Sequence, residues 1–352
     1  MKKIYTRLIT TLLLFAMLLL LVACRSTASN TPQTNTETEN NETTAATIPN
    51  GNISAKGKKV AYLFASSIGD SGWNYTQYVG LQKIGALGAD TTYQESVPYS
   101  SATANIVSLC EMGYEVIFLS TSNFLEYVYA VNKDYPDVTF FVISSSENND
   151  NVRGFLIKDQ DQGFMQGVIA ALLTKTKKVG IVGSTEIVPI RNGLNGFEQG
   201  AKYVNPNIEV VLSYTGSGTD TALAKETAAA MIENGCDVLS PFCDNASAGV
   251  VQVCEENGAW CVGNGINQDE LAPTKLVVSV IKDTSISIEY AFKLWLNGEL
   301  DPAVVPSMGA DSGIVYLSDY YAAASKLSSE DIAYIEETLR KLSSGDIIVQ
   351  HD

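Results

Sequence analysis

The sequence predicts an α/β protein whose parallel sheets are covered by helices on both faces. From residue 58 onward, short runs rich in β-branched and aromatic residues alternate with segments of helix length. This alternation is typical of parallel strands that are joined by helical crossovers. The series of strands and helices then occurs a second time, which predicts two similar α/β domains in tandem.

Each predicted strand is a short β-branched or aromatic run, and each predicted helix is the longer segment between two such runs. The first series has strands at 60–64, 91–95, 116–120, 139–143 and 152–157, with helices at 74–87, 102–112 and 124–133. The second series has strands at 179–182, 208–213, 237–240, 260–262 and 276–281, with helices at 163–174, 190–204, 222–234, 247–257 and 286–296. Sheets of this kind bind ligands at the carboxyl ends of their strands, so functional residues should follow strands.

The N-terminal residues have the pattern of an export signal. Basic residues at positions 2, 3 and 7 precede an uninterrupted apolar run at 12–21, and Val22-Ala23 leads into Cys24. A cysteine directly after the cut site looks like a bacterial lipobox, so we expect a signal peptide at 1–23 and lipidation of Cys24. The alternative is an uncleaved N-terminal anchor with an incidental cysteine. Either way, we expect the protein on the extracytoplasmic face of the cell membrane.

Residues 24–57 are predicted to be a disordered tether. This segment is rich in Thr, Asn, Ser and Glu and has almost no large apolar residue, so it cannot form a core. A flexible chain of this length has a root-mean-square reach of about 30 Å. We therefore expect a globular body held near the membrane by a flexible leash.

The composition excludes several classes of function. The formal net charge is −16, from 23 basic and 39 acidic residues, which disfavours nucleic acid as a partner. The same charge disfavours a strongly anionic ligand unless the pocket is locally positive; its simplest meaning is solubility. His351 is the only histidine, which removes most catalytic triads and zinc sites. We expect no metal, no cofactor and no catalytic residue.

Five cysteines lie beyond Cys24, at positions 110, 236, 243, 254 and 261, and no Cys-x-x-Cys motif occurs. Those at 110, 236 and 261 lie beside apolar runs and are expected to be buried small residues. Because the number is odd, at least one thiol is unpaired within the chain. The alternative for Cys254 and Cys261 is a disulfide between them.

The first predicted strand leads into a glycine-punctuated loop that feeds a helix. Asp70 and Asn74 are candidates for hydrogen bonds to a heterocycle, and Trp73 is a candidate for stacking on it. The alternative is that Asp70 only caps the helix while Trp73 packs on the domain core.

Loops after later strands supply small polar groups, one aromatic ring and one carboxylate, which suit a neutral polar ligand. The candidates are Asn123, Ser144, Phe242, Asp244, Asn264 and Lys282. The alternative for the polar loops is ordinary turn chemistry, and for Lys282 a surface cation. The sequence Gly263-x-Gly265 does not complete a dinucleotide fingerprint, because position 268 is glutamine.

Several motifs in order resemble the basic membrane protein family of bacterial substrate-binding lipoproteins, of the purine nucleoside receptor type. The matching segments are Gly69-Asp70-x-Gly72-Trp73-Asn74, Asp134-Tyr135-Pro136-Asp137-Val138-x-Phe140, Gly163-x-x-x-Gly167-x-x-Ala170-Ala171-Leu172, Lys178-Val179-Gly180, Gly196-Phe197-x-x-Gly200-Ala201, Val204-Asn205-Pro206 and Gly235-Cys236-Asp237-Val238. The resemblance covers roughly residues 58–300. The order and spacing of these motifs together are more specific than any one of them.

The resemblance implies a type I periplasmic-binding-protein fold, with two Rossmann-like lobes joined by three crossovers. The N-terminal lobe would comprise 58–158 plus 279–312, and the C-terminal lobe 159–278 plus 313–352. It further implies a monomeric receptor that delivers a purine base or nucleoside to the permease of an ABC importer. Trp73 occupies the place of the family's stacking aromatic, and Lys282 matches the family's lysine.

The chain departs from the family pattern at three places. Ser144 stands where an acidic residue often reads the base edge, and Gly218 stands where a second aromatic is normal. Phe242 is the candidate to replace that aromatic, while Gly218 leaves room for a bulkier or differently shaped ligand. Asn264 is the nearest substitute for the aspartate that binds ribose. A neutral amide binds hydroxyls more weakly than a carboxylate does, so these departures favour a free base or another flat heterocycle.

Three other functions remain open from the sequence. Two of them keep the same fold, as an importer receptor for a sugar or a signalling molecule and as an extracellular sensor subunit. An enzyme such as a nucleoside hydrolase would need clustered carboxylates or a metal site. Asp269-Glu270 and Glu255-Glu256 are the available acidic pairs, and both are expected to be solvated surface.

Overall fold

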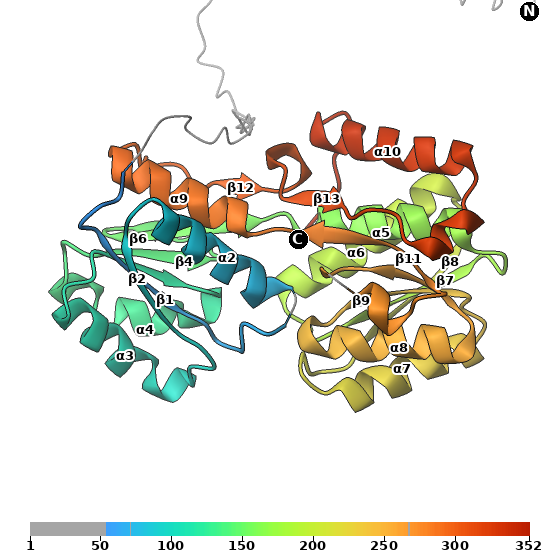
Figure 1. Cartoon of the computed structure of the whole chain (residues 1–352), viewed down its shortest axis with the longest axis horizontal. Helices are drawn as coiled ribbons and strands as arrows, with labels where there is room; N and C mark the ends of the chain where they lie inside the picture. Colours follow the sequence, from blue (N-terminus) through green and yellow to red (C-terminus); the bar gives the residue numbers. More distant parts are fainter. Residues whose placement is uncertain (1–53, 71, 267) are drawn as a thin grey trace, which may run out of the picture. The chain divides into compact units, whose positions relative to one another are not determined.

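The computed structural model describes residues 54–352 except positions 71 and 267, so the predicted signal peptide, Cys24 and nearly all of the tether lie outside the described residues. The described chain forms two α/β lobes, each built on its own sheet (Figure 1). This confirms the predicted fold class. None of the helices in the described part has the length and apolarity that crossing a membrane requires.

The first sheet has the order β2–β1–β3–β4–β6–β12, with every neighbouring pair parallel. A short strand, β5, pairs antiparallel with β6 at its side. The strands are β1 (Lys59–Leu63), β2 (Asp90–Gln94), β3 (Val116–Leu119), β4 (Thr139–Ile143), β5 (Asn148–Asn149), β6 (Val152–Ile157) and β12 (Ser307–Met308).

The second sheet has the order β8–β7–β9–β10–β11–β13, parallel except for the antiparallel pair β11–β13. Its strands are β7 (Lys178–Gly183), β8 (Glu209–Tyr214), β9 (Val238–Phe242), β10 (Trp260–Gly263), β11 (Leu276–Lys282) and β13 (Val315–Leu317). The strand order of each sheet reverses direction once, at β1/β3 in the first and at β7/β9 in the second.

Helices cover both faces of each sheet (Figure 1). On the first sheet, α2 (Trp73–Ala86) and α9 (Ser285–Asn297) lie on one face, and α3 (Tyr99–Glu111) and α4 (Leu125–Tyr129) lie on the other. On the second, α5 (Asp159–Leu173), α6 (Val188–Val204) and α10 (Ser329–Ser343) lie opposite α7 (Thr221–Glu233) and α8 (Ser247–Asn257). Single turns of 3-10 helix occur at Ser122–Phe124, Asn132–Asp134, Asp244–Ala246, Asp269–Leu271, Ala310–Ser312 and Ala322–Lys326.

The predicted elements agree with the structure to within a few residues, with two kinds of exception. The helix predicted at 124–133 is interrupted, because the Asn151 side chain donates hydrogen bonds to the carbonyls of Asn132, Tyr135 and Val138 and so stabilises a turn there. The short strands β5, β12 and β13 and the long helix α10 were not predicted. Strand β11 belongs to the second sheet as far as Lys282, four residues beyond the lobe boundary expected at 278, and the complete lobe boundaries stay a prediction.

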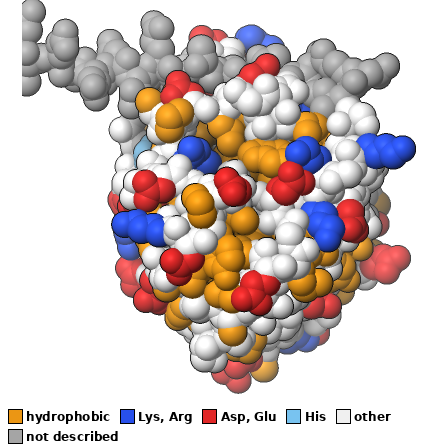
Figure 2. Space-filling view, turned by 90° about the vertical axis from the view of Figure 1, so that its left-hand side faces the viewer, with side chains coloured by type: hydrophobic (Ala, Val, Ile, Leu, Met, Phe, Trp, Pro, Cys, Tyr) orange, Lys and Arg blue, Asp and Glu red, His pale blue; other side chains and the backbone are white. Residues whose placement is uncertain are grey.

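Charged side chains of both signs are interspersed with apolar ones on the outer face of the first lobe (Figure 2). A nucleic-acid-binding surface normally shows a one-sided basic stripe. This face therefore has the character of an ordinary solvated surface.

Helices α5 and α6 approach each other so closely that their backbones touch. A Cβ added at Gly163 or Gly167 would fall on a carbonyl oxygen of α6, and one added at Gly196 or Gly200 would fall on a carbonyl oxygen of α5. The predicted Gly163-x-x-x-Gly167 and Gly196-x-x-x-Gly200 motifs therefore form one reciprocal interface. Only glycine permits this distance, since every other residue carries a Cβ.

We expect Gly163→Ala to destabilise the protein by on the order of 3 kcal/mol, because the methyl group has no space and the two helices must separate. Thermal and urea unfolding of the purified protein measures this. Gly85→Ala is the matched control: its Cβ would meet Thr91 at an ordinary 3.4 Å, and alanine favours the helix by up to about 1 kcal/mol. Equal stability of the two variants would contradict the close-contact argument.

Candidate ligand-binding site

A cavity of about 320 Å³ lies between the carboxyl ends of the two sheets. Its walls include the loops after β1 and β3 in the first lobe and after β7 and β9 in the second, with further residues from the loops after β4, β8 and β10. The loops after β1, β3, β7 and β9 lie where strand order reverses, which is where open α/β sheets bind ligands. Its volume is at the lower end of the range of about 300–1,000 Å³ that small-molecule sites occupy.

Eight of the nine predicted ligand-binding residues line this one cavity: Asp70, Trp73, Asn74, Ser144, Phe242, Asp244, Asn264 and Lys282. Asn123 is exposed and does not line it; its amide donates a hydrogen bond of 3.1 Å to the hydroxyl of Tyr99, which does line the cavity. The binding roles of all nine remain predictions.

Asp70 organises the loop that begins α2. Its carboxylate accepts hydrogen bonds from the backbone N–H groups of Gly72, Asn74 and Tyr75, at 3.0, 2.7 and 2.9 Å, and from the Asn74 side-chain amide at 2.8 Å. The capping role considered as the alternative therefore describes what Asp70 does in this structure. Four donors largely satisfy the carboxylate, so its influence on a ligand acts through Asn74.

Trp73 is half-buried at the first turn of α2, and its ring is fixed by a hydrogen bond of 3.0 Å from Nε1 to the Ser120 carbonyl. Phe242 ends β9 and is almost fully buried. The ammonium of Lys282 lies 5.0 Å from the centroid of the Trp73 ring and 5.1 Å from that of Phe242. Both rings therefore lie within cation–π distance of the same ammonium, and we call the space that it occupies over the two rings the aromatic slot.

Lys282 is positioned by an ion pair with Asp159, the first residue of α5. The lysine side chain is 11% exposed and the aspartate side chain 4%. Burial raises the pKa of the Asp159 carboxyl, and the positive charge of Lys282 opposes that rise. Removing either partner of such a buried ion pair would leave the other charge uncompensated, which is strongly destabilising.

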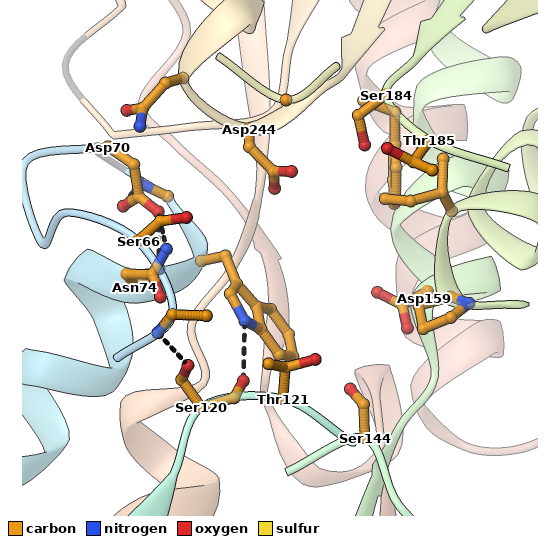
Figure 3. Close-up of a pocket in the computed structure, with 18 of the residues that line it drawn as sticks. Ser66, Asp70, Asn74, Ser120, Thr121, Ser144, Asp159, Ser184, Thr185 and Asp244 are labelled. Carbon is orange, nitrogen blue, oxygen red and sulfur yellow. Dashed lines mark hydrogen bonds between the residues drawn. The ribbon is translucent and has the colours of Figure 1, made fainter. Parts of the chain in front are cut away.

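Ser144 and Asp244 both adopt left-handed backbone conformations, with φ of 58° and 49°. Such angles are unusual for residues other than glycine and are concentrated at functional sites. Each follows a central strand, β4 or β9, and lies at the cavity. The conformation turns both side chains toward the cavity (Figure 3).

Gly218 does not provide the free space that the sequence suggested. A Cβ at this position would lie 2.7 Å from a carboxylate oxygen of Asp244, so the aspartate already occupies the space beside Gly218. Burial raises the pKa of Asp244 to about 6; the charge of Lys282 opposes this rise, whereas Asp70 and Asp159 add to it.

Two buried polar atoms at the cavity have no hydrogen-bond partner within the described residues. They are Oδ1 of Asn74 and Oγ of Ser144. A buried polar atom without a partner costs about 1–3 kcal/mol, so both atoms need partners that arrive with a ligand or with water.

The sequence reasoning missed several lining residues, notably Asp159, Gln162, Ser184 and Gln268. Gln162 donates hydrogen bonds to the carbonyls of Asn264 and Val280, at 3.1 and 2.7 Å. Gln268 accepts hydrogen bonds from the backbone N–H groups of Asn264 and Gly265, both at 3.2 Å. The available sequence signal was the run Asp159-Gln160-Asp161-Gln162, four polar residues that begin two positions after the strand predicted at 152–157. In the structure all four are buried.

The five cysteines of the described region are free and buried, including Cys254 and Cys261. The thiols of Cys254 and Cys261 are in hydrogen-bond contact, and this contact and burial both raise the pKa of Cys261. Among the described residues, no group of three His, Cys, Asp or Glu side chains is arranged to hold a metal ion.

The cavity between two parallel-sheet lobes has the architecture of a solute receptor, and sequence comparison gives the family. Residues 57–352 match the Bmp family, described as PnrA-like ABC transporter substrate-binding proteins. The chain belongs to this family. This match confirms the resemblance to basic membrane proteins. A substrate-binding protein of an ABC transporter implies a small-molecule ligand and a permease partner.

Relatives of this Bmp chain carry different names. A transcriptional activator protein of Bacillus subtilis is 29% identical over 255 residues, covering 71% of this chain and 80% of that protein. A purine-binding protein of Brucella abortus is 25% identical over 293 residues, covering 82% of each. An ABC transporter solute-binding protein of Aeropyrum pernix has the same fold, with a TM-score of 0.73 at 22% identity over 84% of this chain and 94% of that one.

We expect Asp159→Asn and Lys282→Met each to destabilise this Bmp protein by about 3–5 kcal/mol, because each leaves an unpaired charge in a buried position. The double variant should lose much less than the sum, as unfolding in urea would show. The exposed pair Lys202–Glu198 is the control, and Lys202→Met should cost no more than about 0.5 kcal/mol. Additive losses in the buried pair would contradict the coupling.

Proposed function

We propose that the chain binds a purine base or nucleoside in the cavity between its lobes and delivers it to an ABC permease. The observation that carries this proposal is the aromatic slot over the Trp73 and Phe242 rings, bordered by polar groups from both lobes. A flat heterocycle has two π faces for such rings and polar atoms on its edge. The name of the purine-binding relative in Brucella abortus supports the same ligand class.

The polar groups of the cavity favour a heterocycle over a sugar. Sugar sites use many charged side chains that bind hydroxyls in pairs, whereas here Asp70 is occupied by the start of α2 and Asp159 by Lys282, which leaves Asp244 as the remaining carboxylate that lines the cavity. Asn264 offers only a neutral amide where a ribose would gain from a carboxylate. We therefore favour a base over its nucleoside.

Entry of a ring into the slot requires Lys282 to move. The ammonium now lies about equally far from both ring centroids, so a stacked heterocycle would push it to the edge of the slot. From there it can donate a hydrogen bond to a carbonyl or ring nitrogen of the ligand. Closure of the lobes would then exclude water from these contacts.

We expect isothermal titration calorimetry to show binding of a purine base, with a weaker response to nucleosides, pyrimidines and sugars. Trp73→Ala should remove stacking worth about 1–3 kcal/mol. Trp260→Ala is the matched control, because Trp260 also lies beneath a lysine, Lys275 at 4.6 Å from its ring, but does not line the cavity. Binding of a sugar and of no purine would overturn the proposal, and release of free base from nucleosides, followed by chromatography, would indicate an enzyme.

We further propose that Cys24 is lipidated and that the residues after it tether the receptor beside its permease. A receptor held near the membrane meets the permease at a raised effective concentration. Cys24→Ala should therefore release soluble protein with unchanged ligand affinity and reduced uptake. Cell fractionation and transport of labelled ligand test this, and normal uptake by the soluble variant would contradict the tether's role.

A further inference from the structure

The three carboxylates that line the cavity differ in the hydrogen-bond and ion-pair partners of their oxygens. Asp70 accepts four hydrogen bonds from its own loop and the first turn of α2, and Asp159 forms the buried ion pair with Lys282. In the described part of the chain, by contrast, no backbone N–H donates to the carboxylate of Asp244, whose one side-chain donor is the hydroxyl of Ser184. Asp244 is therefore the carboxylate with acceptor capacity left for a ligand.

The backbone is built to hold Asp244 where it is. Asp244 has a left-handed backbone conformation, which residues other than glycine rarely adopt. The turn that follows it is stabilised by a hydrogen bond of 3.0 Å from the N–H of Ala246 to the carbonyl of Gly218. The absence of a side chain at Gly218 gives the carboxylate its space. Figure 3 shows Asp244 pointing into the cavity, between Asp70 on one side and Ser184 on the other.

We propose that Asp244 determines which purine binds, by accepting hydrogen bonds from two neighbouring N–H groups on the ligand's edge. This inference rests on the function proposed above and names the ligand class within it. A carboxylate offers two acceptor oxygens side by side, so its best partner has two donors side by side. A 2-amino-6-oxopurine has this edge, formed by its ring N–H and its exocyclic amino group. Adenine instead places an unprotonated ring nitrogen beside its amino group, and that nitrogen would face a carboxylate lone pair.

A second acceptor supports a donor-rich ligand. Oδ1 of Asn74, from the opposite lobe, is buried and has no hydrogen-bond partner within the described residues. The Asn74 side-chain nitrogen donates a hydrogen bond of 2.8 Å to Asp70. Rotating the amide by 180° would break this bond, so Oδ1 stays directed away from Asp70. A free base can supply a third N–H from its imidazole ring, which a nucleoside lacks at the glycosidic nitrogen.

Protonation of Asp244 should weaken binding of the preferred ligand. The charged groups facing this carboxyl are Lys282 on β11, Asp70 in the loop before α2 and Asp159 on α5, and its pKa is raised to about 6. Above that pH the ionised form offers two acceptors. Below it the acid loses one acceptor and gains a donor, so binding of a donor edge falls as pH falls through about 6.

Equilibrium dialysis of labelled guanine, hypoxanthine and adenine, at about pH 7.5 and about pH 5, tests the inference on the intact globular protein. We expect wild-type protein to bind guanine roughly 10- to 100-fold more tightly than adenine at the higher pH, the fold-change of one charge-assisted hydrogen bond. Asp244→Asn should abolish this preference and flatten its pH dependence. Asp137→Asn, an exposed turn residue outside the cavity, is the control and should behave as wild type.

A second variant keeps the charge of Asp244 but displaces its carboxylate. Gly218→Ala would place a methyl group against the Asp244 carboxylate and should likewise reduce the preference for guanine, even if Asp244→Asn proves poorly folded. An unchanged order of purine affinities in either folded variant would overturn the role of Asp244 and leave the proposed function intact. Binding of no purine by wild-type protein would overturn both.

Discussion

The contact between α5 and α6 is the constraint on which the site depends. Because the two backbones touch through glycines, neither helix can slide or rotate without separating from the other. The first residue of α5 is Asp159, which holds Lys282, and the loop before α6 forms a wall of the cavity. A packing interface inside one lobe therefore fixes the relative positions of an ion pair and of a wall of the ligand site.

The three aspartates that line the cavity have different partners and therefore different roles. Asp70 stabilises the start of α2, Asp159 pairs with Lys282, and Asp244 faces the cavity, where we propose that it binds the ligand. The difference arises from backbone geometry rather than from residue type. A cluster of acidic residues in the sequence would not by itself reveal it, because the partners come from distant segments.

The alternation of short apolar runs and helix-length segments predicted both sheets, because a buried parallel strand and an amphipathic helix have different periodicities. It could not find β12 and β13, which are too short for a period and depend on neighbours that are distant in sequence. Most candidate site residues line one cavity because ligand sites follow strand ends. Asp159 and Gln162 were missed because the helix was predicted to begin at residue 163, which placed them in a connecting loop where polar residues are expected to be solvated, whereas α5 begins at Asp159 and both residues are buried.

The position of Lys282 over two aromatic rings has a consequence for transport. An importer's receptor must release its cargo as well as hold it, and an empty slot open to water would favour rebinding. In the proposed binding mode, the protein's own ammonium would replace the departing ligand and regain contact with both rings. Each binding event would then be an exchange between a resident cation and a heterocyclic ring, and the net affinity would be set by the difference between the two. Such an exchange would let transfer to the permease proceed without a large energetic step.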